Sequence, residues 1–277
     1  MSDFSNNKNA VQPALVILPT YKEAATILEV LSLTLGLPVE MDILVVDDSS
    51  PDGTAELIKN HEEFEKRVFL MQRPGKLGLA TAYMDGFKWA MNKGYQVCLQ
   101  MDSDLSHDPN DLPDLLSSIE NGADIAIGSR YINGISVINW PLHRLILSKG
   151  AGIYTRILTR LPLTDPTAGF KAIHRKVIEN LDWEKVTSDG YGFQIEVNFF
   201  ALQRGFILKE IPIIFTERRD GHSKLSFRIV VEAAFRVLQL GFLSLIPSRN
   251  KLYKGREISL DRTSVDPNIN NNEEKTS

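Results

Sequence analysis

Short apolar runs alternate with helical patterns through the first half of the chain, and this alternation constrains the fold more than any other feature. The apolar runs cover residues 15–19, 43–46, 68–71, 96–101 and 124–128, and the helical patterns cover residues 24–35, 79–91, 110–120 and a segment that begins near Thr54. Strands that alternate with helices of this length predict βαβ units. We therefore expect an α/β fold with a mostly parallel, Rossmann-like sheet flanked by helices.

The second half of the chain is less regular and ends in a polar tail. Residues 142–160 and 193–204 have helical patterns, whereas residues 206–215 look extended, with Pro212 indicating a sheet edge or a break. No linker divides the chain before its tail, so one large domain accounts for most of the 277 residues. We predict a disordered N-terminus at 1–13, one globular domain at 14–226, an amphipathic helix at 227–247 and a disordered tail at 248–277.

Asp102 and Asp104 come directly after the apolar run that ends at Met101. In a strand, residues i and i+2 point to the same side, so the two carboxylates can converge just outside the strand's carboxyl end, where open α/β sheets bind ligands. Carboxylates held this close repel each other unless a cation lies between them, and oxygen ligands suit Mg²⁺ or Mn²⁺. Such an ion would in turn hold a diphosphate. An isolated D-x-D is common in solvated loops, so the prediction depends on the rest of the chain.

Two further apolar runs end in residues that can hold a nucleoside. Thr20-Tyr21-Lys22-Glu23 follows the first run, and Asp47-Asp48 ends the second. Because the carboxyl ends of parallel strands lie along one edge of a sheet, these groups should share a crevice with the later aspartates. Tyr21 could stack on a base, and Glu23 or Asp48 could accept hydrogen bonds. The chain lacks a G-x-x-x-x-G-K-[ST] loop and a G-x-G-x-x-G after its first apolar run. Their absence argues against P-loop NTPases and dinucleotide-dependent dehydrogenases.

Several basic residues suit phosphate binding. They are Arg130 after the fifth apolar run, Arg144 and Lys149 in the helical pattern at 142–160, and Arg218, Arg219 and Lys224 in the segment E-R-R-D-G-H-S-K. Arginine makes bidentate contacts with phosphate, and lysine supplies a point charge. Each cation alone is typical of a solvated surface. Together with an acidic metal site they suit two phosphate groups, one carried on the metal ion and one approaching from outside.

Composition argues against several classes of protein. The net charge of −4 gives no electrostatic basis for nucleic-acid binding. A single cysteine, Cys98, excludes an intramolecular disulfide and a cysteine-based zinc site, and its apolar surroundings predict a buried structural thiol. The N-terminal residues lack the apolar segment of a signal peptide.

Residues 227–246 come nearest to a membrane span, but four polar residues interrupt them: Arg228, Glu232, Arg236 and Gln239. Charges inside a span are costly, so we do not expect the segment to cross a bilayer. On a helix the four residues form a narrow polar stripe beside a wide apolar face. That face either packs on the domain, or lies in a membrane interface or on a membrane-bound partner.

Seven segments then occur in the order L-P-T-Y-K-E (18–23), V-V-D-D-S-S-P-D-G-T (45–54), M-D-S-D-L-S-H (101–107), G-S-R-Y (128–131), D-P-T-A-G-F-K (165–171), G-Y-G-F-Q-I-E (190–196) and G-H-S-K (221–224). In these segments the chain resembles family 2 glycosyltransferases of the GT-A type. Within that family it resembles the dolichol-phosphate (polyprenol-phosphate) mannosyltransferases. The first three segments occur in many family 2 enzymes, whereas the last three are narrower and point to polyprenyl-phosphate acceptors. The resemblance implies a GT-A catalytic domain at residues 14–226.

The resemblance also implies roles for single residues. The nucleotide sugar would be held by Pro19, Tyr21, Glu23, Val46, Asp48, Asp102, Ser103, Asp104, Arg130, Arg218 and Lys224. The acceptor phosphate would be held by Arg130, Arg144 and Ser148, and the metal ion by Asp102, Asp104 and Ser106. The catalytic residues would be Asp104, Arg130 and Lys224. Some relatives have Gln at the position of Ser106, and a serine there would ligate the metal more weakly or through water.

The implied reaction is transfer of mannose from GDP-mannose to a polyprenyl (dolichyl-type) monophosphate, with inversion and with Mg²⁺ or Mn²⁺ as cofactor. The enzyme would be cytoplasmic and peripheral, at the cytoplasmic face of a membrane or on a membrane-anchored partner subunit, and would not bind nucleic acid. Two alternatives stay open. One is a UDP-glucose-dependent polyprenyl-phosphate glucosyltransferase, since Tyr21, Glu23 and Asp48 do not distinguish guanine from uracil. The other is a non-catalytic nucleotide-sugar-binding subunit.

Overall fold

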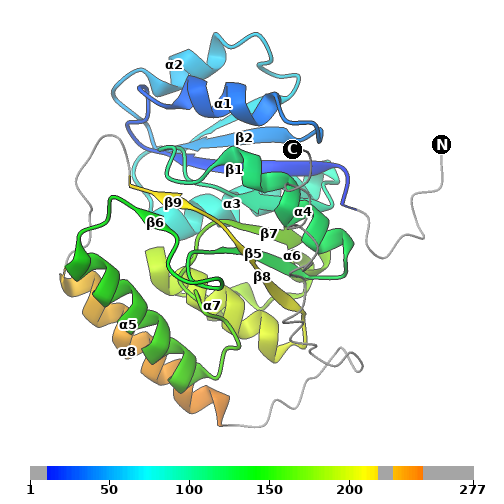
Figure 1. Ribbon diagram of the computed structural model, residues 1–277. Helices are drawn as coiled ribbons and strands as arrows, with labels where there is room; N and C mark the ends of the chain where they lie inside the picture. Colours follow the sequence, from blue (N-terminus) through cyan, green and yellow to red (C-terminus); the bar gives the residue numbers. More distant parts are fainter. Residues whose placement is uncertain (1–10, 218–226, 246–277) are drawn as a thin grey trace, which may run out of the picture.

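The computed structural model describes residues 11–217 and 227–245, and its centre is a seven-stranded sheet in the order β3-β2-β1-β4-β7-β5-β8 (Figure 1). The strands are β1 (Ala14–Thr20), β2 (Asp42–Asp47), β3 (Val68–Gln72), β4 (Val97–Gln100), β5 (Ile125–Ser129), β7 (Lys171–His174) and β8 (Leu208–Pro212). In the described sheet, β7 is antiparallel to β4 and β5, and all other neighbours are parallel. The mostly parallel α/β sheet expected from the sequence is therefore confirmed.

Helices cover both faces of this sheet (Figure 1). One face carries α1 (Ile27–Leu35), α2 (Thr54–Lys59), η1 (Pro109–Asp111) and α4 (Leu112–Glu120). The other carries α3 (Leu79–Lys93), α6 (Arg175–Asn180), η2 (Trp183–Lys185) and α7 (Gly190–Gln203), with α5 (Leu142–Thr159) and α8 (Phe227–Ser244) side by side next to α7. Each face of the sheet thus has its own buried apolar cluster, because alternate strand residues point to opposite faces.

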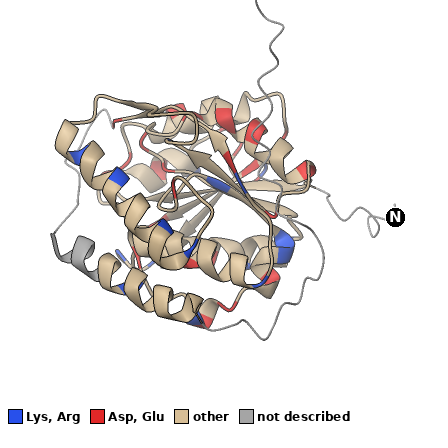
Figure 2. Ribbon diagram, turned by 60° about the horizontal axis from the view of Figure 1, so that its bottom comes forward, with Lys and Arg blue, Asp and Glu red and all other residues tan. Residues whose placement is uncertain are grey.

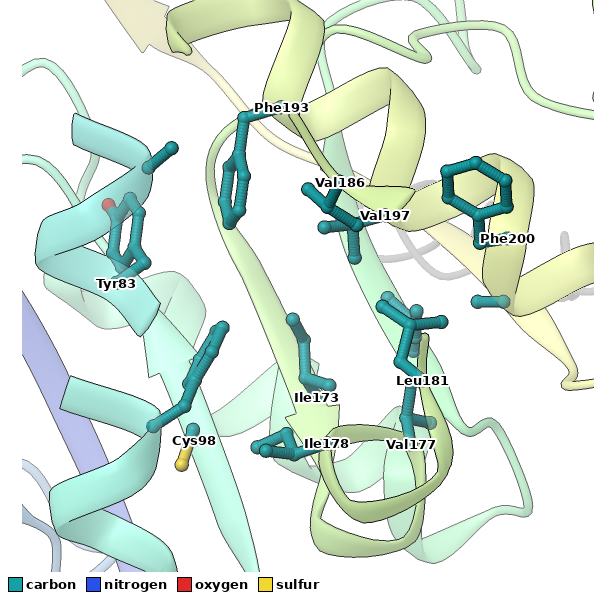
Figure 3. Close-up of a cluster of buried hydrophobic side chains, with 14 of the residues drawn as sticks. Tyr83, Cys98, Ile173, Val177, Ile178, Leu181, Val186, Phe193, Val197 and Phe200 are labelled. Carbon is teal, nitrogen blue, oxygen red and sulfur yellow. The ribbon is translucent and has the colours of Figure 1, made fainter. Parts of the chain in front are cut away.

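The core on the α3 and α7 side contains stacked aromatic rings (Figure 3). Tyr83 of α3 lies with its ring centroid 6.2 Å from that of Phe193 of α7, and the two ring planes differ by 6°. Cys98 is fully buried beneath them, as expected. Burial raises the pKa of its thiol well above the usual value, so the group stays protonated and serves as a small apolar side chain.

The chain changes direction within the sheet between β1 and β4. Strands β1, β2 and β3 are added outward on one side, and the chain then returns to place β4 on the other side of β1. In open α/β folds such a switch point leaves a crevice outside the carboxyl ends of the strands, where ligands bind. The acidic and aromatic residues that follow β1, β2 and β4 lie at this edge.

The second half contains elements that the sequence patterns did not predict. The antiparallel strand β7 begins at Lys171, the last residue of D-P-T-A-G-F-K, and two short strands, β6 (Val137–Ile138) and β9 (Phe215–Thr216), form a separate parallel pair. Pro212 ends β8, which is the edge strand of the large sheet, in agreement with its predicted position. The disordered segments predicted at 1–13 and 248–277 lie outside the described residues, except for positions 11–13.

Helix α8 begins at the predicted position and packs against α5 and α7. Its Val237 and Leu240 are buried. Arg236 forms an ion pair with Glu196 of α7, a fully buried carboxylate that also accepts hydrogen bonds from the backbone N–H groups of Thr187 (2.8 Å) and Ser188 (3.0 Å). Among the described residues, no helix combines the length and apolar character that a membrane crossing needs.

Candidate active site

Hydrogen bonds join the ends of the three strands that carry the predicted nucleotide residues. The Asp48 N–H donates to the Thr20 carbonyl oxygen at 3.0 Å, and the Ser103 hydroxyl donates to the Pro19 carbonyl oxygen at 3.1 Å. The Ser103 carbonyl accepts a further bond from the Thr26 hydroxyl at 2.7 Å. The structure therefore brings Pro19, Asp48 and Ser103 to one edge of the sheet, as predicted.

Tyr21, Glu23 and Val46 lie at the same edge in different environments. The Tyr21 ring is partly exposed, and the Lys76 ammonium group lies 4.5 Å from its centroid. The Glu23 backbone joins this edge to α2, because its N–H donates to the Thr54 hydroxyl at 3.2 Å. Val46 is fully buried in β2. The Tyr21 ring is thus accessible at this edge, whereas the Val46 side chain belongs to the apolar core.

Arg73 is a residue of this site that the sequence patterns did not reveal. It is only 4% exposed, and its Nε donates to Asp48 Oδ1 at 2.6 Å. The second oxygen, Asp48 Oδ2, accepts the Leu77 N–H at 3.2 Å, and Arg73 Nη2 donates to the Gly78 carbonyl at 2.9 Å. Asp48 is therefore fixed as an ion pair with the loop after β3. The position of Arg73 in the sequence could have indicated a place at this site, because the residue directly follows the third parallel strand at the same sheet edge.

Asp102 and Asp104 lie in the loop that directly follows β4. Leu105 has a φ of +62°, and this left-handed turn folds the chain so that the Ser106 N–H donates to Asp104 Oδ1 at 3.0 Å. The Asp102 side chain is 34% exposed, whereas Asp104 is buried. Burial raises the pKa of the nearby Tyr83 phenol well above its usual value, and the negative charges of both aspartates raise it further. Both carboxylates thus lie close enough to Tyr83 to affect its pKa.

The donor groups here fit a hard divalent cation. Within the described part of the chain, no group of three or more His, Cys, Asp or Glu side chains is placed to hold a metal ion. Asp102 and Asp104 are the two carboxylates in this loop. The hydroxyl oxygen of Ser106 is buried beside them and has no hydrogen-bond partner among the described residues. Mg²⁺ in particular is bound by one or two carboxylates with water and substrate phosphates completing its shell. The predicted set of Asp102, Asp104 and Ser106 is consistent with that chemistry.

His107 has a structural role beside this pair. Its Nδ1 accepts the Asp102 N–H at 3.2 Å, so Nδ1 carries no proton in this arrangement. Its ring stacks on Phe170 with the centroids 4.8 Å apart, and it meets the edge of Phe215 at 5.3 Å. Phe215 in turn contacts the Trp140 ring at 5.5 Å. This row of rings connects the aspartate loop to the predicted acceptor residues.

A cavity of about 550 Å³ opens between α5, α7 and α8. Arg130, Arg144 and Ser148, the three predicted acceptor-phosphate residues, all line it. The remaining wall is mostly apolar and aromatic, formed by residues such as Trp140, Leu147, Tyr154, Ile195 and Val237. The structure therefore places the predicted phosphate-binding groups on the wall of one largely apolar chamber.

Arg130 is fixed by Asp165, which lies 35 positions later in the chain. Arg130 Nε and Nη2 each donate to one oxygen of the Asp165 carboxylate at 2.6 Å, and the Arg130 backbone N–H donates to the same group at 3.1 Å. Burial opposes the charge of Arg130, but the ion pair and hydrogen bonds with Asp165 outweigh it and raise the arginine pKa. The Asp165 N–H donates to Glu210 Oε1 at 2.8 Å. Asp165 is thus a positioning residue to which the sequence patterns assigned no role.

Arg144 and Ser148 also have partners in the protein. The Arg144 guanidinium carbon lies 4.2 Å from the Trp140 ring centroid, and Nη1 forms an ion pair with Glu217. The Ser148 hydroxyl is 2.8 Å from the Tyr131 hydroxyl. Arg218 and Lys224, predicted to hold the donor phosphates, lie outside the described residues.

Comparisons with known proteins agree with these observations. The profile of glycosyl transferase family 2 matches residues 15–182. A polyprenol monophosphomannose synthase from Mycolicibacterium smegmatis is 44% identical over 231 residues, covering 83% of this chain and 87% of that protein. An undecaprenyl-phosphate mannosyltransferase from Micrococcus luteus is 41% identical over 232 residues, covering 82% and 93%. A dolichol-phosphate mannosyltransferase from Pyrococcus furiosus is 37% identical over 234 residues, covering 81% and 62%.

Among solved structures, the chain is similar to a glucosyl-3-phosphoglycerate synthase from Mycobacterium tuberculosis, crystallised with Mn²⁺, UDP and glucosyl-3-phosphoglycerate. The TM-score is 0.58 at 17% identity, and the match covers 83% of this chain and 79% of that one. At this identity the likeness concerns the fold, and it confirms the expected GT-A type of α/β architecture.

Proposed function

The chain belongs to glycosyltransferase family 2, and we propose that it transfers mannose from GDP-mannose to a polyprenyl monophosphate with inversion at the anomeric carbon. The observation that carries this proposal is the cavity, where the guanidinium groups of Arg130 and Arg144 line a chamber whose other walls are mostly apolar. Guanidinium groups bind phosphate, and apolar walls suit a hydrocarbon chain that water excludes. The names of three relatives that are 37–44% identical to this chain support the same acceptor and the same sugar.

The donor would bind at the sheet edge. Tyr21, Glu23 and Asp48 would surround the guanosine, and Asp102 and Ser103 would contact its ribose and diphosphate. The Val46 side chain, predicted for the same role, is fully buried in β2 and would not reach the nucleotide. A divalent cation, Mg²⁺ or Mn²⁺, would be held by Asp104 with Asp102 and the Ser106 hydroxyl, and would neutralise charge on the departing diphosphate. Arg218 and Lys224 belong to the donor site in this proposal on the basis of their motif.

The chain's own residues would align the attacking group. A phosphate monoester has a second pKa near 6, so much of it is a dianion at neutral pH and needs no protein base. This agrees with His107, whose Nδ1 is already occupied as an acceptor. Arg130, held by Asp165, and Arg144 would place one phosphate oxygen in line with the anomeric carbon, on the side opposite to GDP. A C–O bond to the lipid phosphate forms as the bond to GDP breaks.

The surface formed by α5 and α8 would meet the membrane that holds the acceptor. Both helices expose large apolar side chains, namely Leu142, Ile146, Leu147, Ile153 and Ile157 on α5 and Phe235, Leu238, Phe242 and Leu243 on α8. Helix α5 also carries Arg144, Lys149 and Arg156 and no acidic residue (Figure 2). Apolar side chains with interspersed cations are typical of helices that lie in the interface of an anionic bilayer. In this proposal the protein acts as a peripheral enzyme at the cytoplasmic face.

Radiolabel transfer tests the proposal directly. Purified protein is incubated with labelled GDP-mannose, a short polyprenyl phosphate and Mg²⁺ or Mn²⁺, and lipid-extractable label is counted with and without EDTA. We expect transfer that EDTA removes, and no transfer from UDP-glucose. Transfer from UDP-glucose alone would establish the glucosyltransferase alternative. No transfer from any donor by the folded protein with liposomes present would favour the non-catalytic alternative.

A further inference from the structure

Arg144, which lines the cavity, already has an anionic partner. Its Nη1 forms an ion pair with Glu217, and the two side chains are 15% and 30% exposed. The Glu217 position is set by the short strand pair, because its N–H donates to the Ile138 carbonyl oxygen at 3.2 Å, just after β9. A phosphate that binds Arg144 must therefore compete with this carboxylate.

The corresponding pair at Arg130 is built differently. Asp165 is 1% exposed, receives three hydrogen bonds from Arg130 and is held through its own backbone by Glu210. Separating that pair would leave a buried charge uncompensated, which is costly. The Arg144 pair is closer to solvent, so the released carboxylate can be hydrated. Of the two anions that hold the cavity's arginines, Glu217 is the exchangeable one.

We propose that Glu217 is a resident counter-anion which the acceptor phosphate displaces from Arg144, and that this exchange selects phosphate monoesters over phosphate diesters. The inference rests on the proposed function, because it assigns Arg144 to the acceptor phosphate.

Charge explains the selection. A monoester carries a charge of about −1.5 to −2 at neutral pH, whereas the Glu217 carboxylate carries a single charge. A monoester therefore gains more from Arg144 than it costs to release the carboxylate. A diester carries one negative charge, as the carboxylate does. Because the Glu217 carboxylate is part of the protein, its local concentration near Arg144 is higher than that of a free diester, and it remains bound there. Phosphodiester lipids, which form most of a phospholipid bilayer, would thus be excluded from the site.

The same exchange would promote product release. During transfer a lipid phosphate oxygen bonds to the anomeric carbon, the sugar's bond to GDP breaks, and GDP leaves with the bonding electron pair. The lipid phosphate changes from a monoester dianion to a diester monoanion. Glu217 can then return to Arg144, and the mannosylated lipid loses its strongest ionic contact.

Binding and turnover of Glu217→Gln test the proposal, with Glu184→Gln as a matched control that removes an exposed carboxylate elsewhere. The ligands are a short polyprenyl phosphate and its methyl ester, a diester of the same chain. Binding is followed by tryptophan fluorescence, since Trp140 lies against Arg144. We expect wild type and Glu184→Gln to prefer the monoester. In Glu217→Gln, the methyl ester should bind about tenfold more tightly, and the preference should narrow correspondingly.

Turnover gives a second measure. In Glu217→Gln, the methyl ester and the mannosylated product should become stronger inhibitors, while the KM for GDP-mannose stays unchanged. Glu217→Asp, which keeps the charge, should restore most of the preference. Equal affinity of wild type for both esters would overturn the inference without any variant, and so would an unchanged preference in a folded Glu217→Gln. If wild type binds the monoester selectively and Glu217→Gln loses that preference, but neither protein transfers mannose, the proposed function fails while the selection by Glu217 stands.

Discussion

The two regions that we propose bind the donor and the acceptor, called here the donor end and the acceptor end, hold their charged groups in different ways. At the donor end, Asp48 and Arg73 form a buried ion pair directly on the ends of β2 and β3, and both oxygens of the carboxylate are occupied. At the acceptor end, Arg144 lies on α5, outside the large sheet, and its partner Glu217 follows a strand of two residues. The comparison indicates a donor site built for fixed geometry and an acceptor site in which one contact can exchange.

The difference follows from the chemistry of the two substrates. A nucleotide sugar presents many polar groups in a defined arrangement, which a preformed set of donors and acceptors can match. A polyprenyl phosphate presents one charged group on a long apolar chain. The protein needs to recognise only that charge and to leave an apolar path beside it. The following predictions test this contrast, from the largest expected effect to the smallest.

Asp104→Asn should lower mannosyl transfer by about 10³-fold or more, because removing the charge weakens the hold on a metal ion that would stabilise the departing diphosphate. The asparagine oxygen can still accept the Ser106 N–H, so the melting temperature should change little. Transfer assays and thermal unfolding of the same preparation provide the measurement. Near wild-type turnover would show that the donor end does not use this aspartate.

Arg73→Met should destabilise the protein by about 3–5 kcal/mol, because it leaves the Asp48 carboxylate without its buried cation. Urea unfolding followed by circular dichroism measures the change. The double variant Arg73→Met with Asp48→Asn should recover part of the loss, since the uncompensated charge is then removed. If the single variant were as stable as wild type, the donor end would not be the rigid part of the molecule.

Arg144→Gln should reduce kcat/KM for the polyprenyl phosphate about 10- to 100-fold, since a charge-assisted phosphate contact is lost. The KM for GDP-mannose should stay within about twofold, because Arg144 lies at the other end of the site. A larger effect on the donor KM than on the acceptor KM would mean that the two phosphate sites are exchanged. Arg156→Gln, on the same helix, is the matched control.

Lys171, a fully buried residue of β7, predicts a pH dependence of the free energy of unfolding. Burial lowers its pKa from 10.5 to about 7, with Asp165 opposing part of the shift, and its ammonium group donates to Asn198 Oδ1 at 2.9 Å. Between these two pKa values the unfolded chain binds a proton that the folded chain does not, so the free energy of unfolding should rise with pH from about 7 to about 10.

In Lys171→Met this rise should be smaller by about 1 kcal/mol per pH unit. Urea unfolding at several pH values checks it, with the exposed Lys88→Met as control. Identical slopes in wild type and Lys171→Met would show that Lys171 does not titrate in this range.

Ile157→Ser with Phe242→Ser should lower binding to anionic liposomes several-fold, because these side chains are 70% and 71% exposed on α5 and α8. Transfer to a short acceptor in detergent should be nearly unchanged. Leu77→Ser, which removes an exposed apolar side chain at the donor end, is the control for flotation. If wild type, the double variant and Leu77→Ser floated equally, α5 and α8 would not form the membrane contact.

The donor end could be predicted from the sequence because its residues directly follow strands that are recognisable by themselves. Asp48 and Asp102 each follow an apolar run, and parallel strands place their carboxyl ends together without further information. Arg73, the partner of Asp48, also follows a parallel strand at this edge, but its role as a buried ion-pair partner became evident only from its burial.

The acceptor end required the structure. Arg144 and Glu217 lie 73 positions apart, and Arg130 and Asp165 lie 35 positions apart, so no local pattern reports that either pair exists. The antiparallel strand β7, which brings the segment after Asp165 into the sheet, has only four residues. A strand this short carries too little periodicity to be recognised. The residues that line the cavity could be listed from the family resemblance, but their partners could not.

The ion pair between Arg236 and Glu196 determines where this protein can be shortened. A fragment that stops after residue 226 would keep the fully buried glutamate and lose the cation that neutralises it, while uncovering the apolar sides of α5 and α7. The smallest piece that can be expected to fold without an uncompensated buried charge therefore extends through α8, although the family profile matches only to residue 182.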